Sequence, residues 1–214
     1  MKQSTVALRF QDAYSDRLLA YLAVFHRASG TTVLHFNLNK TVHQVTSADN
    51  GLSWGEARSL AAELTPLCAS ANAGPGRGVQ LSTGAHAARL VMVGWDKKYP
   101  APDRHDCVWY SDDAGGHWAP SQTPIPEMNE AQVAETMLPG SAAAGDGTAA
   151  TSAVYFNSRT RGNITGKSSE CRASALSTDG GTHFALPVKW NPTLTEPGHG
   201  CQGSVIGLPV GNPK

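Results

Sequence analysis

The chain has 214 residues, of which 40% are hydrophobic and 16% charged, a composition that is ordinary for a globular protein and sufficient for a substantial core. Seventeen basic and seventeen acidic residues give a formal net charge of zero, and the basic residues form no run beyond Arg159 and Arg161, so we expect no nucleic-acid partner. The most apolar stretch, residues 18–25, is too short to cross a bilayer, so we expect no membrane span.

Short apolar runs bounded by turn residues recur along the chain and predict strands. In chain order these runs cover residues 18–25, 32–38, 41–47, 89–95, 107–111, 153–159 and 173–177. Helical periodicity is weak and confined to residues 56–64, and the Ala- and Gly-rich residues 139–152 predict a mobile loop between strands. We therefore expect an almost all-β chain that forms one domain over residues 1–214.

The pattern Ser-x-Asp-x-Gly-x-x-aromatic occurs three times, at residues 47–54, 111–118 and 177–184, with nearly constant spacing. Self-similarity at a fixed period indicates an array of one supersecondary unit, and this period suits a four-stranded propeller blade with long loops. The chain has room for only three to four such blades, whereas a propeller needs at least four to close. We expect an open part of a propeller.

Each copy of the pattern predicts a tight turn with a structural carboxylate. Asp49, Asp113 and Asp179 are placed to accept hydrogen bonds from backbone N–H groups of the turn. The glycine two residues later can adopt a positive φ, and the closing aromatic packs under the hairpin. A carboxylate held in this way is a poor base, so we expect no catalytic role for these three residues.

Cysteine usage and the N-terminus bear on the compartment. Cys68, Cys107, Cys171 and Cys201 form no Cys-x-x-Cys pair and are too sparse for a disulfide framework, which favours free thiols. The polar N-terminal residues do not have the features of a signal peptide. A cytoplasmic location is therefore expected, unless a leader lies upstream of Met1.

No metal site is expected from the His and Cys residues. His105 and Cys107 form one short pair and His199 and Cys201 another, but neither pair has the spacing of a tetrahedral site. The Gly-rich residues 74–78 lack the Gly-Lys-Ser/Thr ending of a phosphate loop. We expect the chain to need no cofactor.

Several segments occur in the order found in sialidases (neuraminidases), and over residues 4–207 the chain resembles that family of exo-α-sialidases. Besides the three repeats, which resemble the family's Asp boxes (BNR repeats), the segments are GPGRGVQL at 74–81, RLVMVGW at 89–95, NEAQVAE at 129–135, NSR at 157–159 and GCQGSV at 200–205. The resemblance implies a six-bladed β-propeller and a sialylated glycan as substrate, carried by a glycoprotein, a ganglioside or an oligosaccharide.

The resemblance also implies a mechanism. Sialidases hold the sugar carboxylate with three arginines, use a tyrosine nucleophile activated by a glutamate, and use an aspartate as acid/base. A neutral phenol suits this substrate, because the carboxylate on the anomeric carbon repels an anionic nucleophile. A planar guanidinium suits a carboxylate, because it binds both oxygens at once.

Two residues of this chain match the family's functional positions. Glu130 falls on the glutamate that activates the tyrosine, and Arg159 falls on one member of the arginine triad, so both are expected to point into one cleft. The simpler interpretations are an ordinary surface carboxylate and a salt-bridged arginine. The interval between the two residues is longer than usual in the family, by the length of the Ala/Gly-rich insertion.

The other catalytic motifs of the family have no match in this chain. The first triad arginine and the acid/base aspartate are expected upstream of it, and the third arginine and the tyrosine downstream of GCQGSV. We therefore expect the chain alone to be inactive. The alternative is a catalytically dead propeller that acts as a glycan-binding or interaction module.

Overall fold

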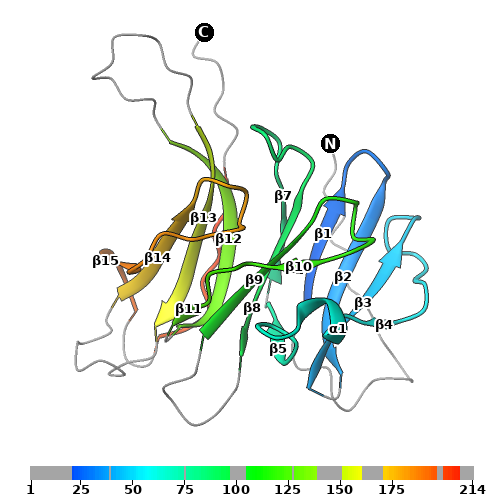
Figure 1. The fold of residues 1–214 in the computed structure, drawn as a ribbon, viewed down its shortest axis with the longest axis horizontal. Helices are drawn as coiled ribbons and strands as arrows, with labels where there is room; N and C mark the ends of the chain where they lie inside the picture. The colour runs from blue at the N-terminus through cyan, green and yellow to red at the C-terminus, as the bar shows by residue number, and fades with distance from the viewer. Residues whose placement is uncertain are drawn as a thin grey trace, which may run out of the picture.

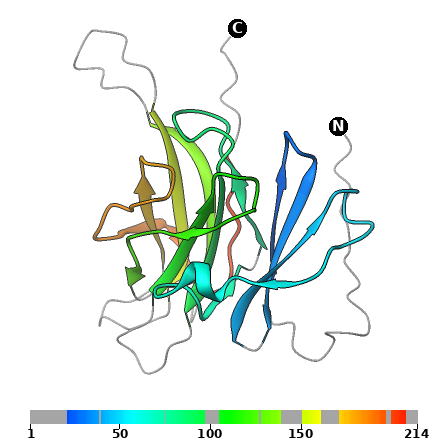
Figure 2. The same ribbon diagram turned by 45° about the vertical axis from the view of Figure 1, so that its right-hand side comes forward.

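The computed structural model describes residues 21–38, 40–74, 76–96, 105–126, 128–138, 151–160, 171–196 and 200–207 (Figure 1). These residues form three β-sheets, which lie side by side in both ribbon views (Figures 1 and 2). We call them the first, central and third sheets in chain order. The all-β prediction is confirmed, since the described part of the chain has a single short helix, α1 (Ala61–Leu64).

The first and central sheets are built from consecutive antiparallel strands with short additions at their margins. In the first sheet the strands are β1 (Tyr21–His26), β2 (Thr31–Leu38), β3 (Thr41–Ser47) and β4 (Arg58–Ser59), with β6 (Gly76–Arg77) parallel to β1. In the central sheet they are β5 (Ala71–Ala73), β8 (Leu90–Asp96), β9 (His105–Ser111) and β10 (Ala119–Pro120), while β7 (Val79–Gln80) pairs with β8 and β11 (Ile125–Pro126) with β9.

The third sheet has four antiparallel strands in sequential order. They are β12 (Met128–Leu138), β13 (Thr151–Thr160), β14 (Cys171–Ser177) and β15 (Lys189–Thr195). Each of the seven predicted runs thus overlaps a strand, and residues 18–20 of the first run lie outside the described residues. The predicted loop at 139–152 lies outside the described residues except for Thr151 and Ser152, which begin β13.

The core lies between neighbouring sheets, because the strands of the central sheet are buried on both faces. Val91, Val93 and Val108 of this sheet belong to one buried apolar cluster with Val133 and Phe156 of the third sheet. Apolar runs buried on both faces are typical of an interior sheet, which explains the near-continuous hydrophobic pattern of β8. This packing fixes how the strand ends of the central and third sheets meet.

A polar network joins the first sheet to the central sheet. The indole of Trp109 donates to His35 Nδ1 at 3.0 Å, and His35 Nε2 lies 3.1 Å from Gln44 Oε1, which also accepts from the Trp118 indole at 2.6 Å. Burial lowers the pKa of His35 to about 3. A neutral imidazole suits these contacts, because one ring nitrogen must accept from Trp109 while the other donates to Gln44.

The three repeats form the predicted turns. In each, the Ser hydroxyl accepts the glycine N–H at 2.8 Å and the Asp carboxylate accepts a backbone N–H at 2.7–2.9 Å. The glycines, Gly51, Gly115 and Gly181, have φ values of 85°, 91° and 91°. Hydrogen bonds from Ser53 lower the pKa of Asp49 to about 2. The prediction that these carboxylates are structural clamps is confirmed.

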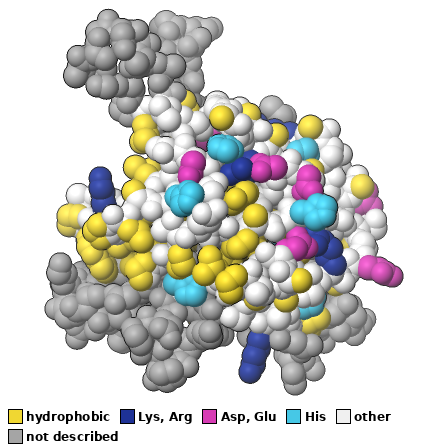
Figure 3. Space-filling view, viewed as in Figure 1, with side chains coloured by type: hydrophobic (Ala, Val, Ile, Leu, Met, Phe, Trp, Pro, Cys, Tyr) yellow, Lys and Arg dark blue, Asp and Glu magenta, His cyan; other side chains and the backbone are white. Residues whose placement is uncertain are grey.

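The surface carries interspersed charges. On the face in Figure 3, side chains of both charges lie among neutral ones, and hydrophobic side chains gather over the third sheet. Leu194 of β15 and Leu186 of the connection before it are 41% and 46% exposed. The four cysteines are free, as expected. No helix in the described part of the chain has the length and hydrophobicity needed to cross a membrane.

Candidate functional site

A β-bulge at the start of β12 brings the two predicted site residues together. Met128 pairs with Thr160 and Ala131 with Ser158, so two residues of β12 stand opposite the single residue Arg159 of β13. One of the two is Glu130. A bulge of this kind redirects a side chain out of the regular pleat, and bulges are common next to active sites.

Glu130 and Arg159 form an ion pair at the bulge. Arg159 Nη1 donates to Glu130 Oε2 at 2.7 Å. The side chain of Glu130 is 25% exposed and that of Arg159 is 20% exposed. Both groups are therefore reachable from one solvent-facing side while most of each side chain is packed. The expectation that the two residues face the same place agrees with this geometry, and so does the simpler interpretation of a salt-bridged pair.

The neighbouring residue Asn129 supports the bulge. Its side-chain oxygen accepts the backbone N–H of Glu130 at 2.9 Å, and its own N–H lies 3.3 Å from Ser158 Oγ on β13. Ser158 is fully buried. The backbone that carries Glu130 is therefore held by polar contacts where the regular ladder is interrupted.

Behind the bulge lies a buried carboxyl group that the sequence did not single out. Asp106 of β9 is completely buried, and Ser158 Oγ is 2.9 Å from its Oδ2. Burial raises the pKa of Asp106 well above its usual value of 3.8; the Ser158 hydrogen bond opposes this effect, and the negative charge of Glu130 adds to it. The carboxyl groups of Asp106 and Glu130 and the hydroxyl group of Ser158 thus lie near one another, although they come from three different strands.

The second glutamate of the NEAQVAE segment has a different environment. Glu135 accepts hydrogen bonds from the backbone and hydroxyl groups of Ser82 and Thr83, at 2.5–3.0 Å. Burial would raise its pKa, but these hydrogen bonds outweigh the burial and lower it. These hydrogen bonds connect β12 to the loop after β7. Of the two glutamates in this segment, Glu130 is therefore the one that lies at the bulge beside Arg159.

The GCQGSV segment packs behind β13. Arg172 of β14 donates to Glu196 at 2.5 Å and to the Cys201 carbonyl at 3.1 Å, and Glu196 accepts the N–H of Thr160 at 2.8 Å. A Cβ atom on Gly203 would lie 2.8 Å from the centre of the Arg172 guanidinium, so this glycine rests directly on it. The end of β13, next to Arg159, is anchored by this buried ion pair.

The other sequence candidates have ordinary contacts. His105 Nε2 and Cys107 Sγ both lie within 3.3 Å of the Leu67 carbonyl, and His199 is outside the described residues. Among the residues that the structure describes, no three His, Cys, Asp or Glu side chains are grouped to hold a metal ion. The contacts of His105 and Cys107 with the Leu67 carbonyl connect β9 to the loop after α1.

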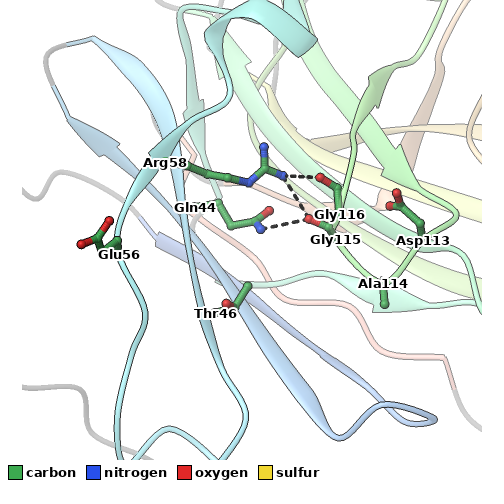
Figure 4. A pocket seen from close by; sticks show the side chains of 8 residues that line it. All are labelled: Gln44, Thr46, Glu56, Arg58, Asp113, Ala114, Gly115 and Gly116. Atoms are coloured by element: carbon green, nitrogen blue, oxygen red, sulfur yellow. Dashed lines mark hydrogen bonds between the residues drawn. The ribbon is translucent and has the colours of Figure 1, made fainter.

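A cavity of about 360 Å³ lies at the other end of β9 (Figure 4). Gln44 and Arg58 line it and donate to the carbonyl of Gly115 at 3.0 Å, and Arg58 also donates to Gly116 at 2.9 Å. β9 runs from His105, beside Asp106, to Ser111, where the second turn begins. The cavity therefore lies between that turn and the first sheet, away from the Glu130 site.

No family model matches the chain, but two curated proteins with similar sequences are named as sialidases. Sialidase-4 from Homo sapiens is 36% identical over 180 residues, which are 79% of this chain and 34% of that protein. Sialidase-3 from Mus musculus is 35% identical over 173 residues, 75% of this chain and 36% of that protein. The chain spans about a third of the length of these relatives.

Two solved structures with a similar fold are named as sialidases. The Hadza microbial sialidase Hz136 has a TM-score of 0.63 at 22% identity, covering 88% of this chain and 36% of that one. A mutant of NanB sialidase from Streptococcus pneumoniae has a TM-score of 0.58 at 13% identity, covering 86% and 41%. At these identities the likeness supports the all-β fold alone.

Proposed function

Because the chain is homologous to the sialidases, we propose that it forms part of an exo-α-sialidase and supplies Glu130 and Arg159 to its active site. The supporting observation is the ion pair that joins these two residues at 2.7 Å on the bulge of β12. The two residues are 29 positions apart in the chain, and the ion pair brings their side chains together. The substrate class is a sialylated glycan.

Arg159 is proposed to bind the carboxylate of the terminal sialic acid. A guanidinium presents its N–H groups in a planar fork that can hold both oxygens of a carboxylate. Glu130 beside it keeps the local charge balanced before the substrate binds. Arrival of the sialic acid would give Arg159 a second carboxylate partner and turn the pair into a three-group cluster.

Glu130 is proposed to act as the base for a tyrosine nucleophile. Its carboxylate takes the phenolic proton as the tyrosine oxygen attacks the anomeric carbon, and the glycosidic bond breaks as an acid protonates the leaving oxygen. The tyrosine, the acid and the other two triad arginines are proposed to come from parts of the enzyme outside these 214 residues. Water then cleaves the glycosyl-tyrosine bond.

The three sheets are proposed to be blades of a six-bladed propeller. Each is built mainly from consecutive antiparallel strands, and each carries one copy of the repeated turn, after β3, β9 and β14. The ion pair of Glu130 and Arg159 lies at the β12 edge of the third sheet, and β12 packs on β8 of the central sheet. An active site at the propeller axis would be lined by strands such as β12.

The chain alone is proposed to be inactive. A nucleophile and an acid/base each contribute about 10²-fold or more to a glycosidase rate, and the residues proposed for these roles lie outside this chain. The purified 214-residue chain should therefore release no fluorophore from a fluorogenic sialoside beyond the rate of its Glu130→Ala variant. Turnover clearly above that control would contradict the proposal.

Binding can be tested on the chain itself by nuclear magnetic resonance. Titration of the ¹⁵N-labelled chain with sialic acid is expected to shift the side-chain Nε–H signal of Arg159 and the amide of Glu130. Arg159→Lys should weaken binding by about tenfold or more, because an ammonium group loses the paired hydrogen bonds to the carboxylate.

Arg58→Lys is the matched control for this titration, because its guanidinium is already occupied by the carbonyls of Gly115 and Gly116. It should leave the affinity unchanged. Equal affinities of wild type and Arg159→Lys, or shifts grouped away from Glu130, would overturn the assignment.

A further inference from the structure

Asp106 is a carboxyl group in an apolar setting at the rear of the proposed site. Strand register places Trp95 of β8 and Ile125 of β11 directly beside it, and its side chain is fully buried. Ser158 touches its Oδ2, while Oδ1 has no hydrogen-bond partner in the described part of the chain. An ionised carboxylate buried without a cation is very costly, and such groups usually become neutral instead.

The contacts of Ser158 favour a proton on Asp106. Ser158 Oγ lies 2.9 Å from Asp106 Oδ2, 3.1 Å from the Arg159 carbonyl and 3.3 Å from the Asn129 carbonyl, and it also faces the Asn129 N–H at 3.3 Å. A hydroxyl has one proton to donate, so it cannot serve a carboxylate and a carbonyl together. If Asp106 carries the proton, it donates to Ser158, and Ser158 donates to a backbone carbonyl.

We propose that Asp106 is a positioning residue for the Glu130–Arg159 pair, acting as a neutral carboxylic acid that holds Ser158. Ser158 in turn binds the backbone of Asn129 on the bulge and of Arg159 opposite it. The inference deepens the proposed function, since it concerns the same site, and rests on it for the roles of the pair.

The neutral form also keeps a second negative charge away from Glu130. The described charged groups near Asp106 are Glu130 from β12, whose charge acts on it directly, and Arg159 from β13, which is engaged by Glu130. On its own strand, His105 contacts the Leu67 carbonyl. Ionisation of Asp106 would place two like charges at the site with one arginine to balance them.

The test compares the unfolding of wild type with Asp106→Asn and Asp106→Leu between pH 4 and pH 7. The asparagine amide can donate to Ser158 as the acid does, whereas leucine cannot. Asp106 has its usual pKa of 3.8 in the unfolded chain and a raised pKa in the fold. Its stabilising effect is therefore complete below 3.8 and is lost as the pH rises toward the folded value.

The wild-type unfolding constant, relative to that of Asp106→Asn, should consequently rise about tenfold per pH unit within this window. The amide signals of Asn129, Glu130 and Arg159 should stay in place in Asp106→Asn and move in Asp106→Leu. Asp49→Asn is the control, because hydrogen bonds from Ser53 and Ser47, which do not titrate, lower the pKa of Asp49 in the fold to about 2. Its ratio to wild type should stay constant above about pH 5, where the carboxyl is ionised in both the folded and the unfolded chain.

A constant wild-type to Asp106→Asn ratio, or equal displacement of the three signals in both variants, would overturn the proposal. If the variants do not fold, the ¹³Cγ signal of Asp106 in the wild-type chain decides: a protonated carboxyl at pH 6 supports the proposal, and a carboxylate at pH 5 overturns it. None of these readouts uses sialic acid, so a failure of the proposed function would be seen separately.

Discussion

Replacing Gly94 by alanine is expected to prevent the central sheet from assembling. A Cβ atom on Gly94 would lie 2.3 Å from the backbone oxygen of Asn72 and 2.8 Å from the Trp109 ring. The first contact is with backbone of β5, which pairs with β8 at this position, so no side-chain rotation can relieve it. Overpacking of this kind costs typically about 1–3 kcal/mol and more where the backbone must move.

We therefore expect Gly94→Ala to lose at least about 3 kcal/mol of unfolding free energy in urea, or to be recovered unfolded. Gly55→Ala is the matched control, because its Cβ would lie 3.6 Å from the Thr46 oxygen, an ordinary contact. That variant should stay within about 0.5 kcal/mol of wild type. A Gly94→Ala protein as stable as Gly55→Ala would show that β5 does not pack as described.

The second large effect is expected from Glu196→Ala. Glu196 is 3% exposed, is paired with Arg172, and accepts the Thr160 N–H. Removing one member of a buried ion pair typically costs about 3–5 kcal/mol, because the other charge stays buried and uncompensated. Thr160 follows Arg159, so the end of β13 should also loosen, which the amide signal of Arg159 would report.

A double-mutant cycle separates these contributions. Glu196→Ala combined with Arg172→Met should be less destabilising than the sum of the single changes, because the double variant buries no unpaired charge. Glu56→Ala, which alters an exposed glutamate, is the control and should change the unfolding free energy by less than about 0.5 kcal/mol. Additivity within error would mean that the two residues are not coupled.

The strands and turns of this fold could be predicted from sequence because they depend on local patterns. β2 and β3 follow apolar runs between turn residues, and the repeated Ser, Asp and Gly positions each satisfy hydrogen bonds within one turn. The hydrogen bonds within each turn join residues two to four positions apart, so a local sequence pattern is sufficient to predict them.

The support of the site could not be predicted, because it depends on contacts between distant strands. Ser158 and Asp106 are 52 residues apart, and the bulge that aims Glu130 follows from the register of β12 on β13. In the sequence, Asp106 lies between His105 and Cys107, the two residues that were considered as metal ligands. Nothing in that pattern marks the aspartate itself as buried or functional. The buried partner of Arg172, Glu196, gave no signal either, since a lone glutamate in a loop has no pattern.

The most direct test of the central claim is a crystal structure of the chain with sialic acid bound. We expect the sugar carboxylate to lie on the guanidinium of Arg159, with Glu130 beside it at the bulge of β12. A different arginine, Arg58, lines a cavity at the opposite end of β9. Sialic acid bound in that cavity, with the Glu130–Arg159 pair untouched, would contradict the assignment of the site.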